Sequence, residues 1–137
     1  MKMLKRVAIG VALMACLAMT QGCFLFVVGA VAAGAVGTVS YVGNELHVTQ
    51  QASVDQAWSA ANGAVQDLQF SVITSKSFKD VTGGTLEARN GKDQPVRIQL
   101  ARNSDRVTEI RIRVGTFDTT ENRQTAQLVW DKMKARL

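Results

Sequence analysis

The sequence lacks cysteine after Cys23, contains one histidine, and has no charged residue between Arg6 and Glu45. Without cysteine, the part after Cys23 can form no disulfide and perform no thiol chemistry. His47 has no further His or Cys after it to complete a metal centre. No serine lies in a nucleophile-elbow pattern, and no glycine-rich loop resembles a phosphate cradle. We therefore expect no catalytic residue, no metal and no cofactor.

Charge is also scarce in the first third of the 137 residues. From residue 45 onward, 13 basic residues face 11 acidic ones, so this part carries a net charge of +2, against +5 for the whole chain. Nucleic-acid affinity comes from clustered Lys and Arg that neutralise phosphates. The near balance excludes a strongly basic nucleic-acid binder, and the uncharged first third excludes a simple cytosolic globule. The length suits one small domain.

Residues 1–22 have the layout of a lipoprotein signal peptide. Three basic residues precede an apolar stretch over 7–19, which is typical of an export signal. Thr20-Gln21-Gly22-Cys23 then resembles a bacterial lipobox, with Thr20 where Leu or Val is usual. Cleavage there would make Cys23 the first mature residue, with acyl chains on its sulfur and amine. Each buried methylene contributes about 0.8 kcal/mol, so several chains give a permanent anchor.

Two alternatives to this cleavage stay open. Residues 13–16 also fit a lipobox ending in Cys16, but that site would leave a very short apolar region before it. Residues 7–43 could instead remain as one uncleaved hydrophobic anchor.

Residues 23–43 begin with Cys23 and continue as an apolar, glycine- and alanine-rich segment. Its 20 residues after Cys23 carry no charge, and a helix needs about 20 to cross a bilayer. Small residues recur every four positions, which on a helix forms a stripe where a second helix can pack closely. The members of this stripe are Gly29, Ala33, Gly37, Ala30 and Gly34. We expect a membrane-contacting, self-associating helix; a flexible tether dipping into the leaflet is the alternative.

Residues 44–137 are expected to form one periplasmic α+β domain in the order β-α-β-β-β-β-α. Ser53 and Gln56 form a capping-box pattern at the start of the first helix, and Asp118 with Glu121 resembles a second. Alternating or helical spacing of apolar residues predicts a strand at 45–50, a helix at 54–68, strands at 70–76, 85–89, 96–100 and 110–114, and a helix ending at Leu137. Asn90-Gly91 predicts a hairpin turn, and Gly83-Gly84 is interpreted as a turn.

Each of the later strands has one apolar and one polar side, which predicts an antiparallel sheet covered on one face. Both helices should pack on the apolar face, as in a helix-grip-like two-layer sandwich. The uncovered face should carry Thr85, Glu87, Arg89, Arg97, Gln99, Glu109, Arg111 and Arg113, with His47 and Glu45 on the polar side of the first strand. The simpler interpretation is Glu–Arg pairing on a solvated face. The alternative is a docking face for an anionic envelope partner, formed by Arg89, Arg97, Arg111 and Arg113.

Trp58 and Trp130 lie on the apolar stripes of the two helices and should pack on the sheet. They could instead line a ligand cavity between helices and sheet. Gly115 follows the last strand, where a positive φ is often needed. Phe117 could then pack as a staple at the start of the last helix.

Two segments resemble a known family: Gly84-Thr85-Leu86-Glu87-Ala88-Arg89, and the run 107–117 with Arg113-Val114-Gly115-Thr116-Phe117. Together with Cys23, Tyr41 and Trp58, they make the chain similar to the bacterial lipoprotein family catalogued as domain of unknown function 3568. The resemblance implies an exported, lipid-anchored envelope protein with no assigned reaction.

The sequence thus favours a lipid-anchored envelope protein whose domain binds a partner or helps to organise the envelope. Its partners would be the membrane, an envelope protein or a second copy, and not nucleic acid. Phe24 is not the Asp that retains lipoproteins in the inner membrane, so the periplasmic face of the outer membrane is expected. The alternative function is a carrier of a small apolar ligand or lipid.

Overall fold

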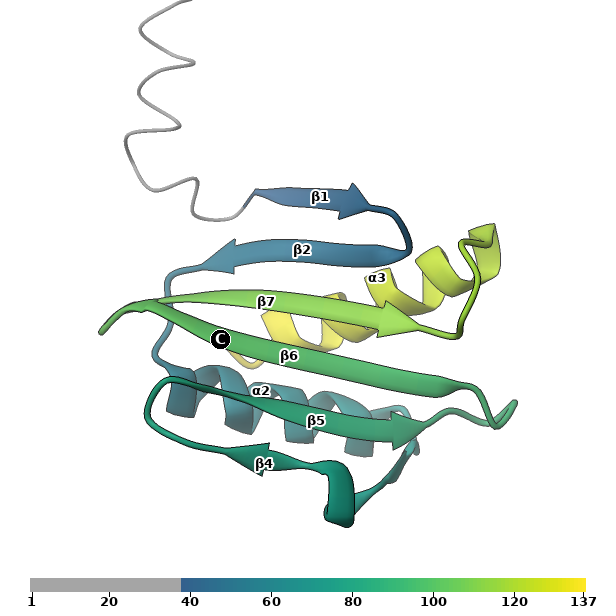
Figure 1. Cartoon of the computed structure of the whole chain (residues 1–137), viewed down its shortest axis with the longest axis horizontal. Coiled ribbons are helices and arrows are strands. Elements are labelled where there is room, and N and C mark those ends of the chain that lie inside the picture. The colour runs from purple at the N-terminus through teal and green to yellow at the C-terminus, as the bar shows by residue number, and fades with distance from the viewer. Residues whose placement is uncertain (1–37) are drawn as a thin grey trace, which may run out of the picture. The chain divides into compact units, whose positions relative to one another are not determined.

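The computed structural model describes residues 38–137, which form a two-layer α+β domain (Figure 1). Seven strands make one antiparallel sheet in the order β1-β2-β7-β6-β5-β3, and β4 pairs with β5 outside this path. The strands are β1 (Val39–Val42), β2 (Glu45–Gln50), β3 (Ser71–Val72), β4 (Phe78–Lys79), β5 (Gly83–Arg89), β6 (Pro95–Ser104) and β7 (Val107–Val114). The helices are α2 (Val54–Asp67) and α3 (Thr120–Lys134), with a short 3-10 helix, η1 (Thr74–Lys76). The predicted fold class is confirmed.

Both helices lie on the same face of the sheet. In Figure 1, α2 runs behind β5 and β6, while α3 runs behind β2 and β7. Strand β7 is central because β2 and β6 pair on either side of it. Its inward residues Ile110, Ile112 and Val114 are fully buried, as the alternation predicts. The core lies between this apolar face and the two helices.

Helix α2 begins as the sequence predicts. The Ser53 hydroxyl accepts a hydrogen bond from the Gln56 N–H, and the Gln56 side chain accepts one from the Ser53 N–H. This capping box satisfies two N–H groups that a helix leaves free at its start. Gly63, inside the helix, lies against the guanidinium of Arg136, which forms a two-pronged ion pair with Asp67. That pair joins the ends of the two helices.

Helix α3 begins one residue later than predicted. Thr119, and not Asp118, is the N-cap, and its hydroxyl accepts a hydrogen bond from the Asn122 N–H. Asp118 instead accepts two hydrogen bonds from the Arg123 guanidinium, which holds the pKa of this carboxyl below its usual range. The helix ends before Leu137, whose side chain is exposed and does not extend the buried stripe.

The segment between β7 and α3 confirms one prediction and overturns another. Gly115 adopts φ +68°, and a Cβ there would lie 2.5 Å from the Asn122 side-chain nitrogen. The positive φ that favours glycine is therefore present. Phe117 is not a staple, because its side chain is 75% exposed. Its backbone carbonyl accepts a hydrogen bond from Asn122 instead.

The predicted strand over 70–76 is interrupted. Only Ser71 and Val72 pair with β5 before η1 begins, and β4 resumes the pairing at Phe78. The Ser77 hydroxyl donates to the Ile73 carbonyl and accepts from the Glu87 N–H, so it replaces the missing strand contacts. Gly83 and Gly84 were predicted to form a turn, but they are the first residues of β5.

The domain also begins earlier than the boundary predicted at residue 44. Val39–Val42 were assigned to the apolar segment 23–43, yet they form the edge strand β1 and pair with β2. Tyr41 reaches α3, where its hydroxyl donates to the Arg123 carbonyl and the Arg123 guanidinium lies 5.5 Å from its ring. Partial burial raises the pKa of Tyr41. The domain therefore begins with one strand more than predicted.

Replacing Thr108 with valine should lower the free energy of unfolding by about 1–3 kcal/mol. The fully buried Thr108 hydroxyl donates to the Ala52 carbonyl at 2.8 Å, just before α2. Valine keeps the shape but deprives the carbonyl of this donor. Urea unfolding measures the effect, with Thr49→Val on β2 as the matched control because the Thr49 side chain is not buried. Equal losses in both variants would contradict this role for the hydroxyl.

Candidate functional site

The face of the sheet opposite the helices carries polar and charged side chains from four strands, and we call it the open face. It is turned toward the viewer in Figure 1. The residues predicted to point outward do so, because their strand neighbours Leu46, Leu86, Ile98 and Ile112 are all buried on the helix side. The open face is formed by Glu45, His47 and Thr49 of β2, Thr85 and Glu87 of β5, Arg97 and Gln99 of β6, and Glu109, Arg111 and Arg113 of β7.

One row of the open face brings two arginines together. Register places Arg113 directly opposite Arg97 on β6 and opposite Glu45 on β2, while Arg97 lies opposite Glu87 on β5. The Arg97 guanidinium pairs with Glu87 at 2.7 Å. Among the residues that the structure describes, Arg113 takes part in none of the ion pairs. The predicted Glu–Arg pairing therefore holds for Arg97, while Arg113 lies beside Glu45 without forming an ion pair.

A second row contains His47, Arg111, Gln99 and Thr85. The Arg111 Nε donates to Glu109 at 2.8 Å, and this hydrogen bond raises the pKa of Arg111 further. His47 Nε2 lies 3.3 Å from a Glu45 carboxylate oxygen, and Nδ1 lies 3.8 Å from Glu109. Nε2 is buried and makes no hydrogen bond, since the Glu45 contact has poor geometry. The proximity of Glu109 to His47 required the β2–β7 register, which the sequence does not specify.

Arg89 points toward the same side but belongs to a different environment. Its guanidinium donates to the Asp93 carbonyl at 2.7 Å and lies 3.4 Å from the Asp93 carboxylate. Both contacts are to the hairpin loop whose turn at Asn90-Gly91 the sequence predicts. Arg89 is therefore engaged in holding the hairpin, and the arginines that the sheet brings together are Arg97, Arg111 and Arg113.

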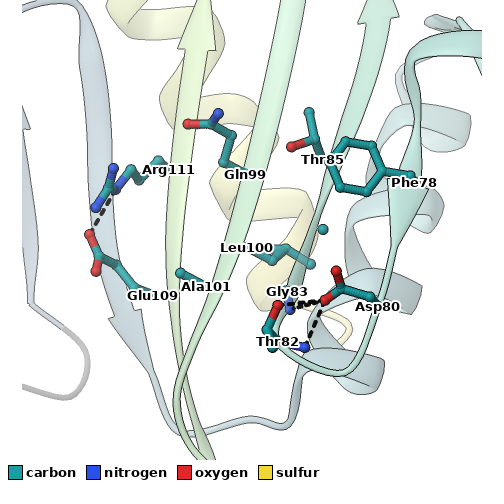
Figure 2. A pocket seen from close by; sticks show the side chains of 11 residues that line it. Phe78, Asp80, Thr82, Gly83, Thr85, Gln99, Leu100, Ala101, Glu109 and Arg111 are labelled. Atoms are coloured by element: carbon teal, nitrogen blue, oxygen red, sulfur yellow. Dashed lines mark hydrogen bonds and ion pairs between the residues drawn. The ribbon is translucent and has the colours of Figure 1, made fainter.

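Two shallow pockets lie on the open face. A pocket of about 340 Å³ is lined by residues of β4 to β7 that include Phe78, Thr85, Gln99 and Arg111 (Figure 2). A second pocket of about 250 Å³ contains Arg97 and Arg113, with Glu87, Pro95, Val96, Gly115 and Thr116. The two pockets are neighbours along β6 and β7, because Gln99 and Arg111 of the first lie two residues from Arg97 and Arg113 of the second. We call the two pockets together the polar strip.

Two residues that line the first pocket were not predicted from the sequence. Phe78 lies on β4 opposite Thr85, with its side chain 61% exposed. Asp80 closes the pocket end and accepts hydrogen bonds from the Thr82 hydroxyl and from the N–H groups of Thr82 and Gly83 (Figure 2). These bonds, the hydroxyl first, lower the pKa of Asp80. An interrupted edge strand gives no clear alternation, so Phe78 could not be placed on this face in advance.

The interior between helices and sheet is filled by side chains. Trp130, Val129 and Met133 of α3 are buried in the core with the inward residues of β2 and β7. Trp58 is partly buried and its ring lies against Gly84, where a Cβ would come within 3.1 Å. Both tryptophans therefore pack on the sheet as predicted. This packing speaks against the cavity that a carrier of an apolar ligand would need.

Among residues 38–137, no group of three His, Cys, Asp or Glu residues could hold a metal ion. Neither α2 nor α3 is long and apolar enough to cross a membrane. The predicted lipidation residue Cys23 and the small-residue stripe of Gly29, Ala30, Ala33, Gly34 and Gly37 lie outside the described residues.

The chain matches a known protein family. The family model described as a protein of unknown function (DUF3568) covers residues 6–128. This range includes the apolar N-terminal part, the whole open face and most of α3. No curated protein matches the chain.

Proposed function

The chain belongs to the DUF3568 family of proteins of unknown function, and from this premise we propose that it is a lipid-anchored envelope protein whose domain binds a partner and catalyses no reaction. Acyl chains on Cys23 would hold it at the periplasmic face of the outer membrane. The domain beyond residue 38 would then present its open face to a partner of the envelope.

One observation of the structure carries the binding role. Both helices cover the same face of the sheet, so the other face stays uncovered. It carries two shallow pockets, one of which is lined by Arg113, an arginine that forms no ion pair among residues 38–137. Sheets with one solvated face are common, and most surface ion pairs contribute little. An arginine directly opposite another arginine costs stability, however, and a partner with negative charge would relieve that cost.

The anchor is supported by the order of features at the N-terminus. Basic residues, an uncharged apolar stretch and Thr20-Gln21-Gly22-Cys23 follow one another as in lipoprotein precursors. Several acyl chains are needed for stable attachment, because one chain binds a membrane only reversibly. The apolar segment after Cys23 would add contact with the leaflet, and its small-residue stripe would let two copies associate.

Replacing Cys23 with alanine should abolish labelling by a radioactive or clickable fatty acid, because the acyl acceptor sulfur is then absent. The measurement is fatty-acid labelling of the full chain in a Gram-negative host, followed by separation of membrane and soluble fractions. Cys16→Ala is the matched control and should be labelled like the wild type. Continued labelling of Cys23→Ala, or its loss in Cys16→Ala, would contradict the assignment.

A further inference from the structure

We propose that the open face binds an extended acidic segment of a partner protein, with one carboxylate on Arg113 and an apolar side chain against Phe78. The inference rests on the proposed binding role and names the chemistry of the partner. Two sites at opposite ends of one polar strip carry it. At one site Arg113 forms no ion pair among residues 38–137, and at the other the Phe78 side chain is 61% exposed.

Arg113 is the charged end of the strip. It is only partly exposed, lies opposite Arg97, and forms no ion pair with any residue among 38–137. Arg97 is held in place by Glu87, whereas Arg113, whose neighbour on its other side is Glu45 of β2, forms no ion pair with either strand neighbour. A guanidinium donates two parallel hydrogen bonds to a carboxylate, so the interaction is directional as well as electrostatic. The pocket of about 250 Å³ around Arg97 and Arg113 leaves room for one such group.

Phe78 is the apolar end of the strip. Its ring stands beside Thr85 at the margin of the larger pocket, away from the helices (Figure 2). The side chain is 61% exposed although it belongs to a paired strand. Gln99 and Arg111 line the floor between this ring and the centre of the sheet. Covering the ring would remove apolar surface from water.

The spacing of the two ends sets the length of the ligand. The row through Arg111, Gln99, Thr85 and Phe78 crosses four adjacent strands, and Arg113 lies two residues beyond Arg111 on β7. With strands about 4.8 Å apart and about 3.4 Å per residue, the two ends are about 16 Å apart. An extended peptide covers that distance in about five residues.

Charge distribution favours a discrete segment over a membrane surface. Glu45, Glu87 and Glu109 lie on the open face around the arginines. A flat anionic surface would face these carboxylates as well as Arg113, and like charges repel. A peptide can place its single carboxylate on Arg113 and keep uncharged atoms elsewhere.

The test uses the full chain purified in detergent and a fluorescent peptide with one glutamate and one phenylalanine about five residues apart. Arg113→Gln should weaken binding, followed by fluorescence anisotropy, about tenfold, as expected for the loss of one charge-assisted contact. Phe78→Ser should weaken binding by a smaller factor, and a peptide with lysine for glutamate should bind poorly to the wild type. Arg106→Gln is the matched control, since it removes the same charge from the exposed β6–β7 turn. It should leave the affinity unchanged.

Equal affinity of wild type and Arg113→Gln for the peptide would overturn the inference. It would also be overturned if the peptide fails to bind while Arg113→Gln lowers cosedimentation with phosphatidylglycerol vesicles and not with phosphatidylcholine vesicles. That result would assign the face to a lipid surface. Circular dichroism of each variant verifies that it folds. If the peptide does not bind, acyl labelling at Cys23 is still expected and the proposed anchor stands. If Cys23 is not labelled, the proposed anchor is wrong, and the result of the peptide experiment does not change.

Discussion

Replacing Ile112 with alanine is expected to lower the free energy of unfolding by about 2–5 kcal/mol, the largest effect of any substitution considered for this domain. Ile112 has 0% of its surface exposed and lies at the middle of the central strand β7. Its partners across the sheet are Leu46 on β2 and Ile98 on β6, both equally buried. Truncation removes contacts with both neighbours and leaves a cavity that a well-packed sheet cannot close.

Urea unfolding followed by tryptophan fluorescence measures this loss, because Trp130 is part of the same core. The matched control is Leu128→Ala, which removes a side chain of similar size from a position that is 45% exposed on α3. We expect the control to change stability by less than about 0.5 kcal/mol. A loss below about 1 kcal/mol for Ile112→Ala would contradict the position of the core.

Replacing Gly83 with alanine is expected to lower the free energy of unfolding by about 1–3 kcal/mol. A Cβ at Gly83 would lie 2.0 Å from the backbone carbonyl oxygen of Leu100 on β6. Backbone cannot move aside without breaking the β5–β6 pairing, so the added methyl group must displace the strand. Because Gly83 also lines the larger pocket of the open face, the substitution should distort that pocket.

Gly91→Ala is the matched control for this substitution. Gly91 lies in the β5–β6 hairpin, and nothing lies within 4 Å of the position that its Cβ would take. Alanine there should leave stability unchanged or raise it slightly, because it restricts the unfolded chain. If both variants unfold at the same urea concentration, β5 and β6 do not approach each other closely at Gly83.

Periodicity alone predicts most of this fold because the sheet has one buried face. Alternation over 96–100 and 110–114 assigns each side chain to a face, and a slip by one residue would expose every apolar group. The Ser53–Gln56 capping box likewise fixes the start of α2 from local chemistry. These elements are encoded by neighbours in the sequence, so no tertiary information is needed to place them.

The elements that could not be predicted depend on distant contacts. Strand β1 has no buried run of its own and is defined by its pairing with β2. Gly83 and Gly84 have the composition of a turn, and only the close approach of Leu100, Phe78 and Trp58 explains why glycine stands in a strand. The start of α3 differs through local contacts: Thr119 is the N-cap, and Asp118 pairs with Arg123 of the first turns.

The candidate site likewise combines features that the sequence predicts with features that only the structure shows. The sequence assigns Arg97, Arg111 and Arg113 to one face, but only the register shows that Arg97 and Arg113 stand opposite each other. Glu87 and Glu109 neutralise two of these arginines and leave the third. Arg89 was expected on the docking face, yet the hairpin loop holds it.

The lipid anchor is tested most directly by the intact mass of the protein extracted from the envelope of its host. We expect a mature chain that begins at Cys23 and carries the added mass of acyl chains on its sulfur and amine. Fragmentation should place all of that mass on the first residue. An unmodified chain that retains residues 1–22, or one that begins elsewhere, would contradict the lipid anchor.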